Sequence, residues 1–353
     1  MYYEGNACER VVQLNRYNII STRAAKLSVP ARYRDVGLFV LLAILFGGSF
    51  VAIKTGLREL PPLLFAGLRF DIGAAVLAGY VVATQPRSKW IPRTRSDLLA
   101  IGIAGVFLIA LNSALLFMGQ GTTTPAMASI MYGLSPVLAP VFAWWVLGDR
   151  LSKVGAVGIS VALAGVVIIV QPSASALASG TAVGQVLILG AATAVAAGSV
   201  LLERVRPQIG YLPLTAWAMA VGAVLLHGLS LGSGEPQASV AEIGPHTVAS
   251  LLVVGIPATA VAYAIQFDLL ERLGSVRTNL VAYVVPIAAA LTGWLVLGAG
   301  LSAGTVLGFL VVVAGFGLVE RRTVRHEACR LRRWRARRRE PTQARADSWP
   351  CDD

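Results

Sequence analysis

The sequence predicts an all-α integral membrane protein whose ten transmembrane helices form two inverted repeats of five helices each. The first observation behind this prediction is composition, since the 353 residues are 56% hydrophobic and only 14% charged. A soluble protein usually has about 25% charged residues. Second, the apolar residues gather in runs of about 20, the length of a helix that crosses a bilayer. Third, the second half of the chain repeats the first in register.

Hydropathy places the ten spans along the chain. Their expected bounds are residues 36–57, 61–83, 98–118, 124–147, 152–171, 181–203, 212–231, 247–270, 274–298 and 301–320. Most connections are very short, so neighbouring spans are predicted to be antiparallel. The predicted units are a cytoplasmic N-terminal tail (1–35), a first five-helix repeat (36–171), a second five-helix repeat (181–320) and a basic cytoplasmic C-terminal tail (321–353).

Basic residues set the expected orientation. Of the 30 Lys and Arg residues, 27 lie in the two tails or after the second, fourth, sixth and eighth spans. Cytoplasmic loops collect Lys and Arg, so both termini are predicted to be cytoplasmic in a cell (inner or plasma) membrane. Residues 1–34 lack the apolar core of a signal peptide, and we interpret them as a cytosolic tail or as sequence upstream of the native start. The basic run RLRRWRARRRE at 330–340 is interpreted as lipid-facing, and no nucleic-acid partner is expected.

The internal repeat has a constant offset of 150 residues. GGSFVAIK at 47–54 matches AGSVLLER at 197–204, and WWVLGDRLS at 144–152 matches WLVLGAGLS at 294–302. An odd number of spans in each repeat places the two copies in opposite orientations. Inverted repeats of this kind are typical of transporters, which bind their solute at the repeat interface near the middle of the membrane.

Other classes of function lack their motifs. The three cysteines lie in the tails without paired spacing and the three histidines are far apart, so neither a disulfide framework nor a metal site is predicted. No GxxxxGK[ST] motif is present, and we expect no cofactor and no enzyme activity. Any energy coupling would use an ion gradient or the gradient of the solute.

Pro136 and Pro286 occupy equivalent positions about 18 Å into their spans, near the middle of the bilayer. A proline inside a helix frees the carbonyl group four residues earlier. Interrupted helices that meet at this depth are expected at a transport site. The alternative is that the two prolines only kink the helices for packing, and the sequence favours neither interpretation.

Polar side chains at the same depth are candidates for lining a cavity. They are Asn112, Ser113, Tyr132, Ser135, Tyr263, Gln266, Asn279 and Tyr283. The alternative is that they form hydrogen bonds between helices, each of which contributes about 0.6 kcal/mol on average.

Two charges stand in the apolar stretch LLFAGLRFDIGAAVLAGY of the second span. Arg69 and Asp71 are about 200° apart around a helix, so they cannot pair with each other. A charge at this depth is costly, and at least one of the two must face the bundle interior. Arg69 is interpreted as a gate or a clamp for a solute carboxylate. Asp71 is interpreted as an interior carboxylate that takes up a proton during transport. Lys54 is expected to snorkel toward the headgroups.

Several segments resemble one family. FVAIKTGL in the first span, LLFAGLRF in the second, and P…LG(D)RLS…G…G across the fourth and fifth are similar to the EamA-type drug/metabolite transporters, over about residues 36–320. An arginine at the place of Arg69 is also similar to the family, whereas Asp71 matches no family pattern. The family usually has a glutamate after LG in both repeats. Here Asp149 and Ala299 stand at these positions, which suggests that Asp149 is structural.

The resemblance implies secondary transport, with many bacterial members that export amino acids, metabolites or toxic compounds. It also implies a cavity lined by the third, fourth, eighth and ninth helices together with the first and sixth. We therefore expect an exporter of small organic solutes that works by alternating access between the repeats. The alternatives are an exchanger of anionic or nucleotide-linked metabolites and, in another class, a membrane enzyme acting on lipids. The expected partners are a small-molecule substrate and the lipid bilayer; coupling to protons and a homodimer are left open.

Overall fold

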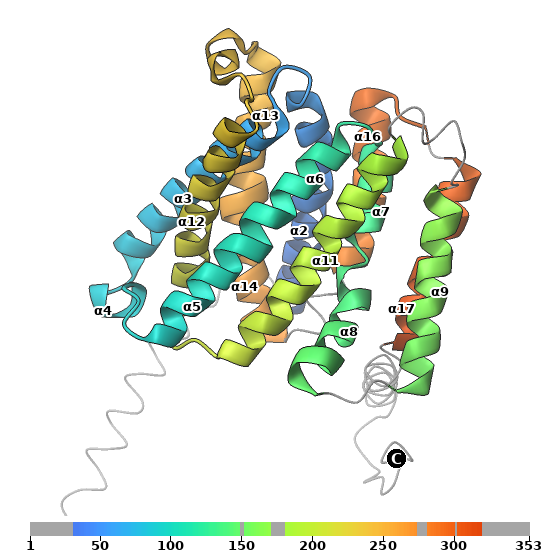
Figure 1. Ribbon diagram of the computed structural model, residues 1–353, viewed down its shortest axis with the longest axis horizontal. Coiled ribbons are helices and arrows are strands. Elements are labelled where there is room, and N and C mark those ends of the chain that lie inside the picture. Colours follow the sequence, from blue (N-terminus) through green and yellow to red (C-terminus); the bar gives the residue numbers. More distant parts are fainter. Residues whose placement is uncertain (1–30, 149–151, 171–180, 274–280, 301, 320–353) are drawn as a thin grey trace, which may run out of the picture.

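The computed structural model describes residues 31–148, 152–170, 181–273, 281–300 and 302–319, and all regular structure in these ranges is helical (Figure 1). The first-repeat elements are α2 (Ala31–Gly56), α3 (Pro62–Thr84), α4 (Arg87–Trp90), α5 (Arg95–Ile103), η1 (Ala104–Leu111), α6 (Asn112–Gln120), α7 (Pro125–Tyr132), α8 (Ser135–Leu147) and α9 (Lys153–Val170). The second-repeat elements are α11 (Thr181–Val205), α12 (Tyr211–Gly232), η2 (Gln237–Glu242), α13 (Pro245–Gly255), η3 (Ile256–Val261), α14 (Ala262–Leu273), α16 (Val281–Leu297) and α17 (Ala303–Val319).

Within the described ranges, seven helical segments are long and apolar enough to cross a membrane. They are Arg34–Gly56, Pro62–Thr84, Arg95–Gln120, Pro125–Leu147, Thr181–Val205, Tyr211–Gly232 and Pro245–Gln266. The other three predicted spans coincide with the shorter apolar helices Lys153–Ile169, Val281–Leu297 and Ala303–Val319. The all-helical class is confirmed, and the number of ten spans stays a prediction.

The two ends of the bundle differ in charge. The connections from α3 to α5 and from α11 to α12 lie together at one end (Figure 1). We call it the basic end, because Arg87, Lys89 and Arg93 lie in the first connection and Arg204 and Arg206 lie at the start of the second. The loops 57–61, 121–124 and 233–244 lie at the other end, which we call the opposite end. The predicted alternation of basic loops therefore agrees with the arrangement of the helices.

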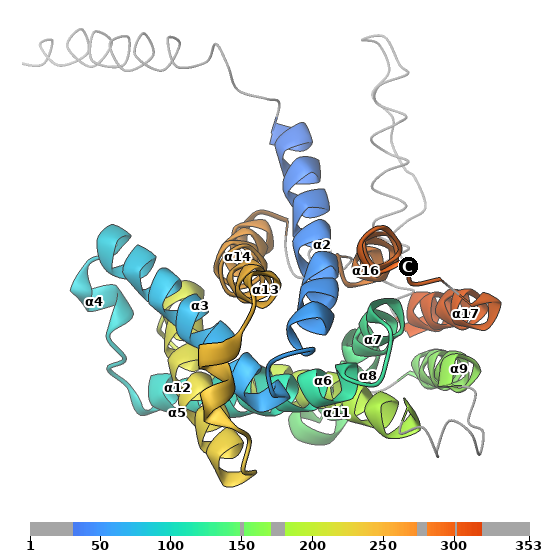
Figure 2. The same ribbon diagram turned by 90° about the horizontal axis from the view of Figure 1, so that it is seen from above.

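Each repeat packs its first helix against the other repeat. Helix α2 lies against α16, and α11 lies against α7 and α8. Figure 2 shows α3 and α12 side by side at one edge of the bundle and α9 and α17 at the other. The helices η1 and η3 are both π-helical and occupy equivalent places in the two repeats. Sequence reasoning gave no hint of these π-helical segments.

Glycines allow the closest helix contacts. A Cβ atom on Gly158 would lie 2.7 Å from the carbonyl oxygen of Gly315, and one on Gly165 would lie 2.8 Å from that of Gly308. Helices α9 and α17 therefore meet backbone to backbone along this glycine seam (Gly158, Gly165, Gly308 and Gly315). Small residues serve this purpose between helices in membranes, where lipid offers no hydrophobic drive for association.

Carboxylates at the opposite end join the repeats by capping helices. Glu235 accepts hydrogen bonds from the amides of Leu63 (3.1 Å) and Leu64 (2.8 Å), in the first turn of α3. Glu59 accepts one from the amide of Gly244 (2.7 Å), just before α13. This amide, together with the Thr247 hydroxyl, lowers the pKa of Glu59. The cap therefore stabilises the fold above the ordinary pKa of Glu59 and is lost as the pH falls through the lowered value.

Candidate functional site

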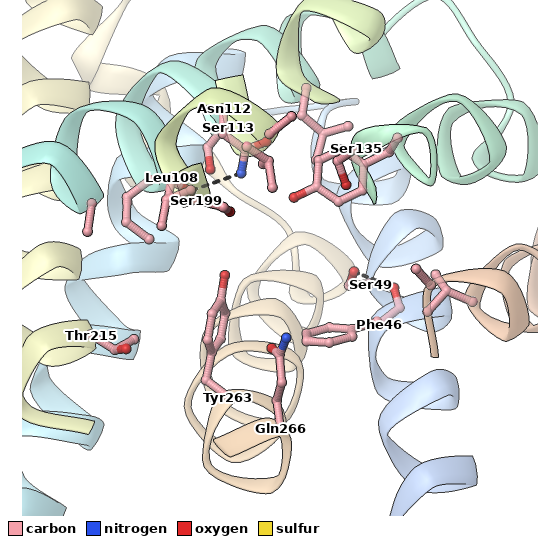
Figure 3. Close-up of a pocket in the computed structure, with 18 of the residues that line it drawn as sticks. Phe46, Ser49, Leu108, Asn112, Ser113, Ser135, Ser199, Thr215, Tyr263 and Gln266 are labelled. Atoms are coloured by element: carbon pink, nitrogen blue, oxygen red, sulfur yellow. Dashed lines mark hydrogen bonds between the residues drawn. The ribbon is translucent and has the colours of Figure 1, made fainter. Parts of the chain in front are cut away.

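A cavity of about 460 Å³ lies where the two repeats meet (Figure 3). Its wall comes from α2, α3, η1, α6, α7 and α8 of the first repeat and from α11, α12, α14 and α16 of the second. Most of the lining is apolar or aromatic, with a few polar groups between. The predicted site residues that line this cavity are Arg69, Asn112, Ser113, Tyr132, Ser135, Pro136, Tyr263 and Gln266.

Arg69 is the only Lys or Arg among the described residues that line this cavity. Its side chain is buried, at 8% exposure, and its Nε donates a hydrogen bond of 2.8 Å to Oγ1 of Thr259. The guanidinium also lies over the rings of Phe70, at 4.9 Å from the centroid, and Phe117, at 5.7 Å. Contact with aromatic faces stabilises a desolvated cation. Within the described part of the chain no ion pair joins Arg69 to a carboxylate, which leaves its charge available to an anion.

Thr259 holds Arg69 through the π-helical segment η3. Its hydroxyl accepts from Arg69 and donates to the carbonyl oxygen of Val254, five residues earlier, over 2.7 Å. Sequence reasoning missed Thr259, because a threonine inside the apolar run IPATAV gives no sign of its partner. The arrangement links the cavity cation directly to the helix that carries Tyr263.

Two tyrosines from different repeats share the cavity with Arg69. Tyr132 of α7 and Tyr263 of α14 both line it. Edge contacts hold the rings in place, from Phe50 to Tyr132 and from Phe46 to Tyr263, each with centroids 6.1 Å apart. Figure 3 shows Tyr263 and Gln266 rising from α14 into the space below Asn112 and Ser113. The cavity thus combines one cation, phenol groups and aromatic surfaces.

The two prolines differ in their effect. Helix α7 ends at Tyr132 and α8 begins at Ser135, so the chain breaks just before Pro136, as predicted. Pro286 instead lies buried inside α16, which runs unbroken from Val281 to Leu297, and it does not line the cavity. Of the two interpretations left open for Pro286, the structure shows no interruption of α16, which agrees with a role in packing at this position.

Two further predicted residues in the described part of the chain, Tyr283 and Asp71, are not among the groups that line the cavity. Tyr283 packs against Phe316, with ring centroids 4.1 Å apart. Asn279 lies outside the described residues, as does Asp149. Asp71 is on the outer side of α3, where its half-exposed carboxylate hydrogen-bonds His227 of α12 at 2.7 Å. The expectation that Asp71 faces the interior is wrong, because the same rotation that turns Arg69 inward turns Asp71 outward.

The position of Asp71 leads to a prediction about pH. Replacing Asp71 by Asn keeps an acceptor for His227 and changes no group of the cavity, so the pH profile of solute transport is expected to stay the same. The measurement is tracer uptake into proteoliposomes across a range of pH, with His227→Gln as the matched variant on α12. If Asp71→Asn removed the pH dependence, Asp71 would regain the proton-carrying role that its sequence position suggests.

The two ends of the cavity differ in exposure. Its lining includes Tyr211, which is half-exposed at the start of α12 at the basic end, whereas Ile53, toward the opposite end, is buried. Toward the opposite end, Nζ of Lys54 donates to the carbonyl oxygens of Gln120 (3.0 Å) and Gly121 (2.6 Å). The side chain of Gln120 in turn donates to the carbonyl oxygen of Phe50. Lys54 thus binds the end of α6, where it was expected to reach only the headgroups.

Beyond Lys54 lies a second cavity of about 580 Å³, which we call the vestibule. Its lining includes Lys54, Arg58, the threonines at 122–124, and Leu297 and Ala299 at the end of α16. Lys54 therefore stands at the closed boundary between the central cavity and the opposite end.

Comparison with known proteins gives the same architecture. The sequence profile described as "EamA-like transporter family" matches residues 35–171 and 182–321. An "Uncharacterized transporter" of Archaeoglobus fulgidus is 28% identical over 284 residues, covering 79% of this chain and 94% of that protein. A "Probable amino-acid metabolite efflux pump" of Salmonella typhimurium is 27% identical over 304 residues, covering 83% and 98%. A crystal structure with 22% identity has a TM-score of 0.57 and covers 82% of this chain and 97% of its own, which shows the shared fold.

These relatives are transporters and not enzymes, which excludes the membrane-enzyme alternative. The family matches both halves of the chain, and the apolar helices and the inter-repeat cavity agree with it. The chain is a multi-pass membrane transporter and belongs to the EamA-like transporter family.

Proposed function

We propose that this protein exports small organic solutes that carry one carboxylate, with the basic end in the cytoplasm of a plasma (inner) membrane. The observation that carries the proposal is Arg69, a buried guanidinium without a carboxylate partner in the described chain, in a cavity built by both repeats. Guanidinium groups bind carboxylates through two parallel hydrogen bonds. A carboxylate-bearing solute would supply the missing partner.

The lining narrows the class of solute. A volume of about 460 Å³ is in the range of small-molecule sites. Phe46, Phe50 and Phe70 offer apolar surface for the body of the solute, while Tyr132 and Tyr263 offer hydroxyls near the cation. Arg69 is the only Lys or Arg among the described lining residues, which favours a single carboxylate over a phosphate or nucleotide-linked group. The name of the Salmonella relative, "Probable amino-acid metabolite efflux pump", supports this class of solute.

We propose export as the direction because the cavity approaches the basic end in this conformation. Lys54 closes it toward the vestibule. With the basic loops in the cytoplasm, a solute would load from the cell and leave on the other side. No Asp, Glu or His is among the described lining residues, so we propose no proton carrier inside the cavity.

The test is transport by the purified protein in proteoliposomes. Three solutes with one phenyl body serve as the panel: 3-phenylpropionate, its amide and 3-phenylpropylamine. We expect saturable transport of the carboxylate and at most background flux of the amide and the amine. The direction of transport is assigned by determining how the protein is inserted in the liposomes. For this, a cysteine is introduced in loop 233–244 and its labelling by a membrane-impermeant reagent is measured. Equal protein-dependent flux of the acid and its amide would refute the carboxylate requirement.

A further inference from the structure

The two repeats place equivalent cations on different helix ends. Lys54 and Arg204 occupy the same position at the offset of 150 residues. Lys54 donates to the carbonyl oxygens of Gln120 and Gly121, at the C-terminal end of α6 in its own repeat. Arg204 donates through Nη1 to the carbonyl oxygen of Val146, near the end of α8 in the other repeat. In both cases a cation sits at a helix C-terminus, where the backbone carbonyls are unsatisfied.

The repeat shows where Lys54 could bind in another conformation. The equivalent of Val146 is Val296, near the end of α16, and both α8 and α16 end in a glycine with positive φ, Gly148 and Gly298. The end of α16 lies near Lys54, because Leu297, Ala299 and Lys54 all line the vestibule. A second acceptor, equivalent to the one that Arg204 uses, is therefore present across the vestibule.

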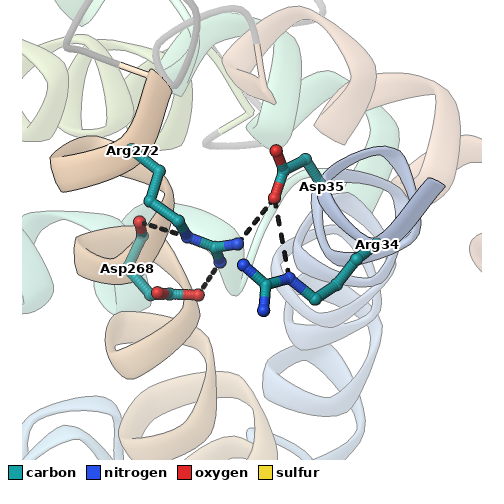
Figure 4. A network of polar contacts seen from close by, with 4 residues as sticks. All are labelled: Arg34, Asp35, Asp268 and Arg272. Atoms are coloured by element: carbon teal, nitrogen blue, oxygen red, sulfur yellow. Dashed lines mark hydrogen bonds and ion pairs between the residues drawn. The ribbon is translucent and has the colours of Figure 1, made fainter. Parts of the chain in front are cut away.

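Helix α6, which Lys54 binds, packs closely on α11 in this structure. A Cβ on Gly119 of α6 would lie 2.8 Å from Cγ1 of Ile188 and would clash with the backbone of Gly184. The equivalent helix α14 makes a smaller contact with α2. At that contact, Nη1 of Arg272 in α14 lies 2.6 Å from Oδ1 of Asp35 in α2, and Arg272 also forms an ion pair with Asp268 (Figure 4). The two ends of the bundle thus differ in packing, because α6 has a larger contact with α11 than its equivalent α14 has with α2.

Both helices follow a π-helical segment. Helix α6 continues from η1 and α14 continues from η3. Such π-helical segments inside an α-helix are rare and frequently lie at functional sites. Because Thr259 of η3 binds Arg69 and residues of η1 line the cavity, both segments border the solute site.

From these observations we infer that Lys54 is the gate residue of the opposite end. It latches α6 to α2 in the conformation open to the basic end. In the conformation open to the vestibule, α6 swings outward at η1 and Lys54 moves to the carbonyl oxygen of Val296, as Arg204 binds Val146 in the present one. This inference rests on the proposed alternating access, in which each repeat takes up the conformation of the other. Lys54 is a positioning residue, because it acts by placing α6.

The test measures the position of α6 and needs no solute. Spin labels at Met118→Cys on α6 and Val186→Cys on α11, both exposed positions, report the separation by pulsed EPR in lipid nanodiscs. Cys8, Cys329 and Cys351 are changed to Ser. With Lys54 present, the short distance of the closed end dominates. In Lys54→Gln the fraction at longer distance rises about tenfold, as expected for the loss of a hydrogen bond to a charged group.

Matched variants separate the latch from a general effect of charge. Lys54→Arg can reach the same carbonyls and is expected to restore the short distance. Arg58→Gln removes an exposed cation of the vestibule wall, one turn further along, whose side chain makes no described hydrogen bond to α6. Because the latch itself stays intact in this variant, the short distance is expected to stay dominant. Lys54→Met serves as the second variant if Lys54→Gln is not recovered folded. An unchanged distance distribution in the Lys54 variants, or equal lengthening in Arg58→Gln, would overturn the inference. Because the experiment measures no transport, its result can be interpreted even if the carboxylate proposal fails.

Discussion

Replacing Arg69 by Gln is expected to abolish carboxylate transport while leaving the protein folded. The amide is too short to reproduce the two parallel hydrogen bonds of a guanidinium, and it carries no charge. A hydrogen bond to a charged group contributes about 1.5–3 kcal/mol, so the affinity for the carboxylate should fall by roughly 10- to 150-fold. The measurement is the binding constant of 3-phenylpropionate by titration calorimetry, together with the KM of its transport.

Arg69→Lys gives a sharper comparison than removal of the charge. Lysine keeps the positive charge and loses the planar fork, so the carboxylate should bind more weakly than to the native protein and more tightly than to Arg69→Gln. Thr259→Val removes the acceptor for Nε of Arg69 and tests whether the orientation of the fork contributes. Monodisperse elution and unchanged thermal unfolding are the controls for folding. If the carboxylate bound to Arg69→Gln with native affinity, the solute would have to contact another part of the cavity.

Gly315→Leu is expected to cause a large loss of stability. A Cβ at this position would lie 2.6 Å from the carbonyl oxygen of Gly158 and 2.5 Å from the amide nitrogen of Ala162. Both neighbours are backbone atoms of α9, which cannot rotate away, so α9 and α17 must separate. Overpacking of this kind costs about 1–3 kcal/mol or more. The free energy of unfolding is measured by titration with SDS in mixed micelles.

The control lies two residues further along the same helix. A Cβ on Gly317 would have no neighbour within 4 Å, so Gly317→Leu adds the same side chain to α17 without touching α9. It should leave the unfolding free energy unchanged or raise it slightly, because leucine favours helix more than glycine does. Equal destabilisation by both leucines would show that the glycine seam is not the cause.

Sequence reasoning identified the depth of the site better than its orientation. The offset of 150 residues and the length of the apolar runs located the polar residues near the middle of the membrane, and Asn112, Tyr132 and Tyr263 do line one cavity. The 200° between Arg69 and Asp71 showed that they face opposite ways. That angle is relative, however, and only the packing of α3 against α12 and α13 decides which of the two points inward.

Other features could not be read from the chain at all. His227 has no local motif, and it becomes the partner of Asp71 only because α12 lies against α3. The π-helical η1 has the same apolar composition as the α-helix around it, since the change concerns backbone hydrogen bonds and leaves no pattern of residue types. The partner of Lys54 is a pair of backbone carbonyls, which every residue possesses, so the identity of the residues there gives no signal.

The packing of α2 against α16 has a consequence for biosynthesis. A Cβ on Gly47 would lie 2.6 Å from Cβ of Ala288, so the face of α2 around Gly47 is shaped for a helix that the ribosome makes almost last. This face of the nascent α2 must therefore stay in contact with lipid or with the insertion machinery until α16 is made, since chains emerge from the N-terminus during synthesis. Closure of the bundle is therefore a late event. In a chain that ends before α16, the face of α2 around Gly47 would stay uncovered, and we expect quality-control proteases of the membrane to degrade such a chain.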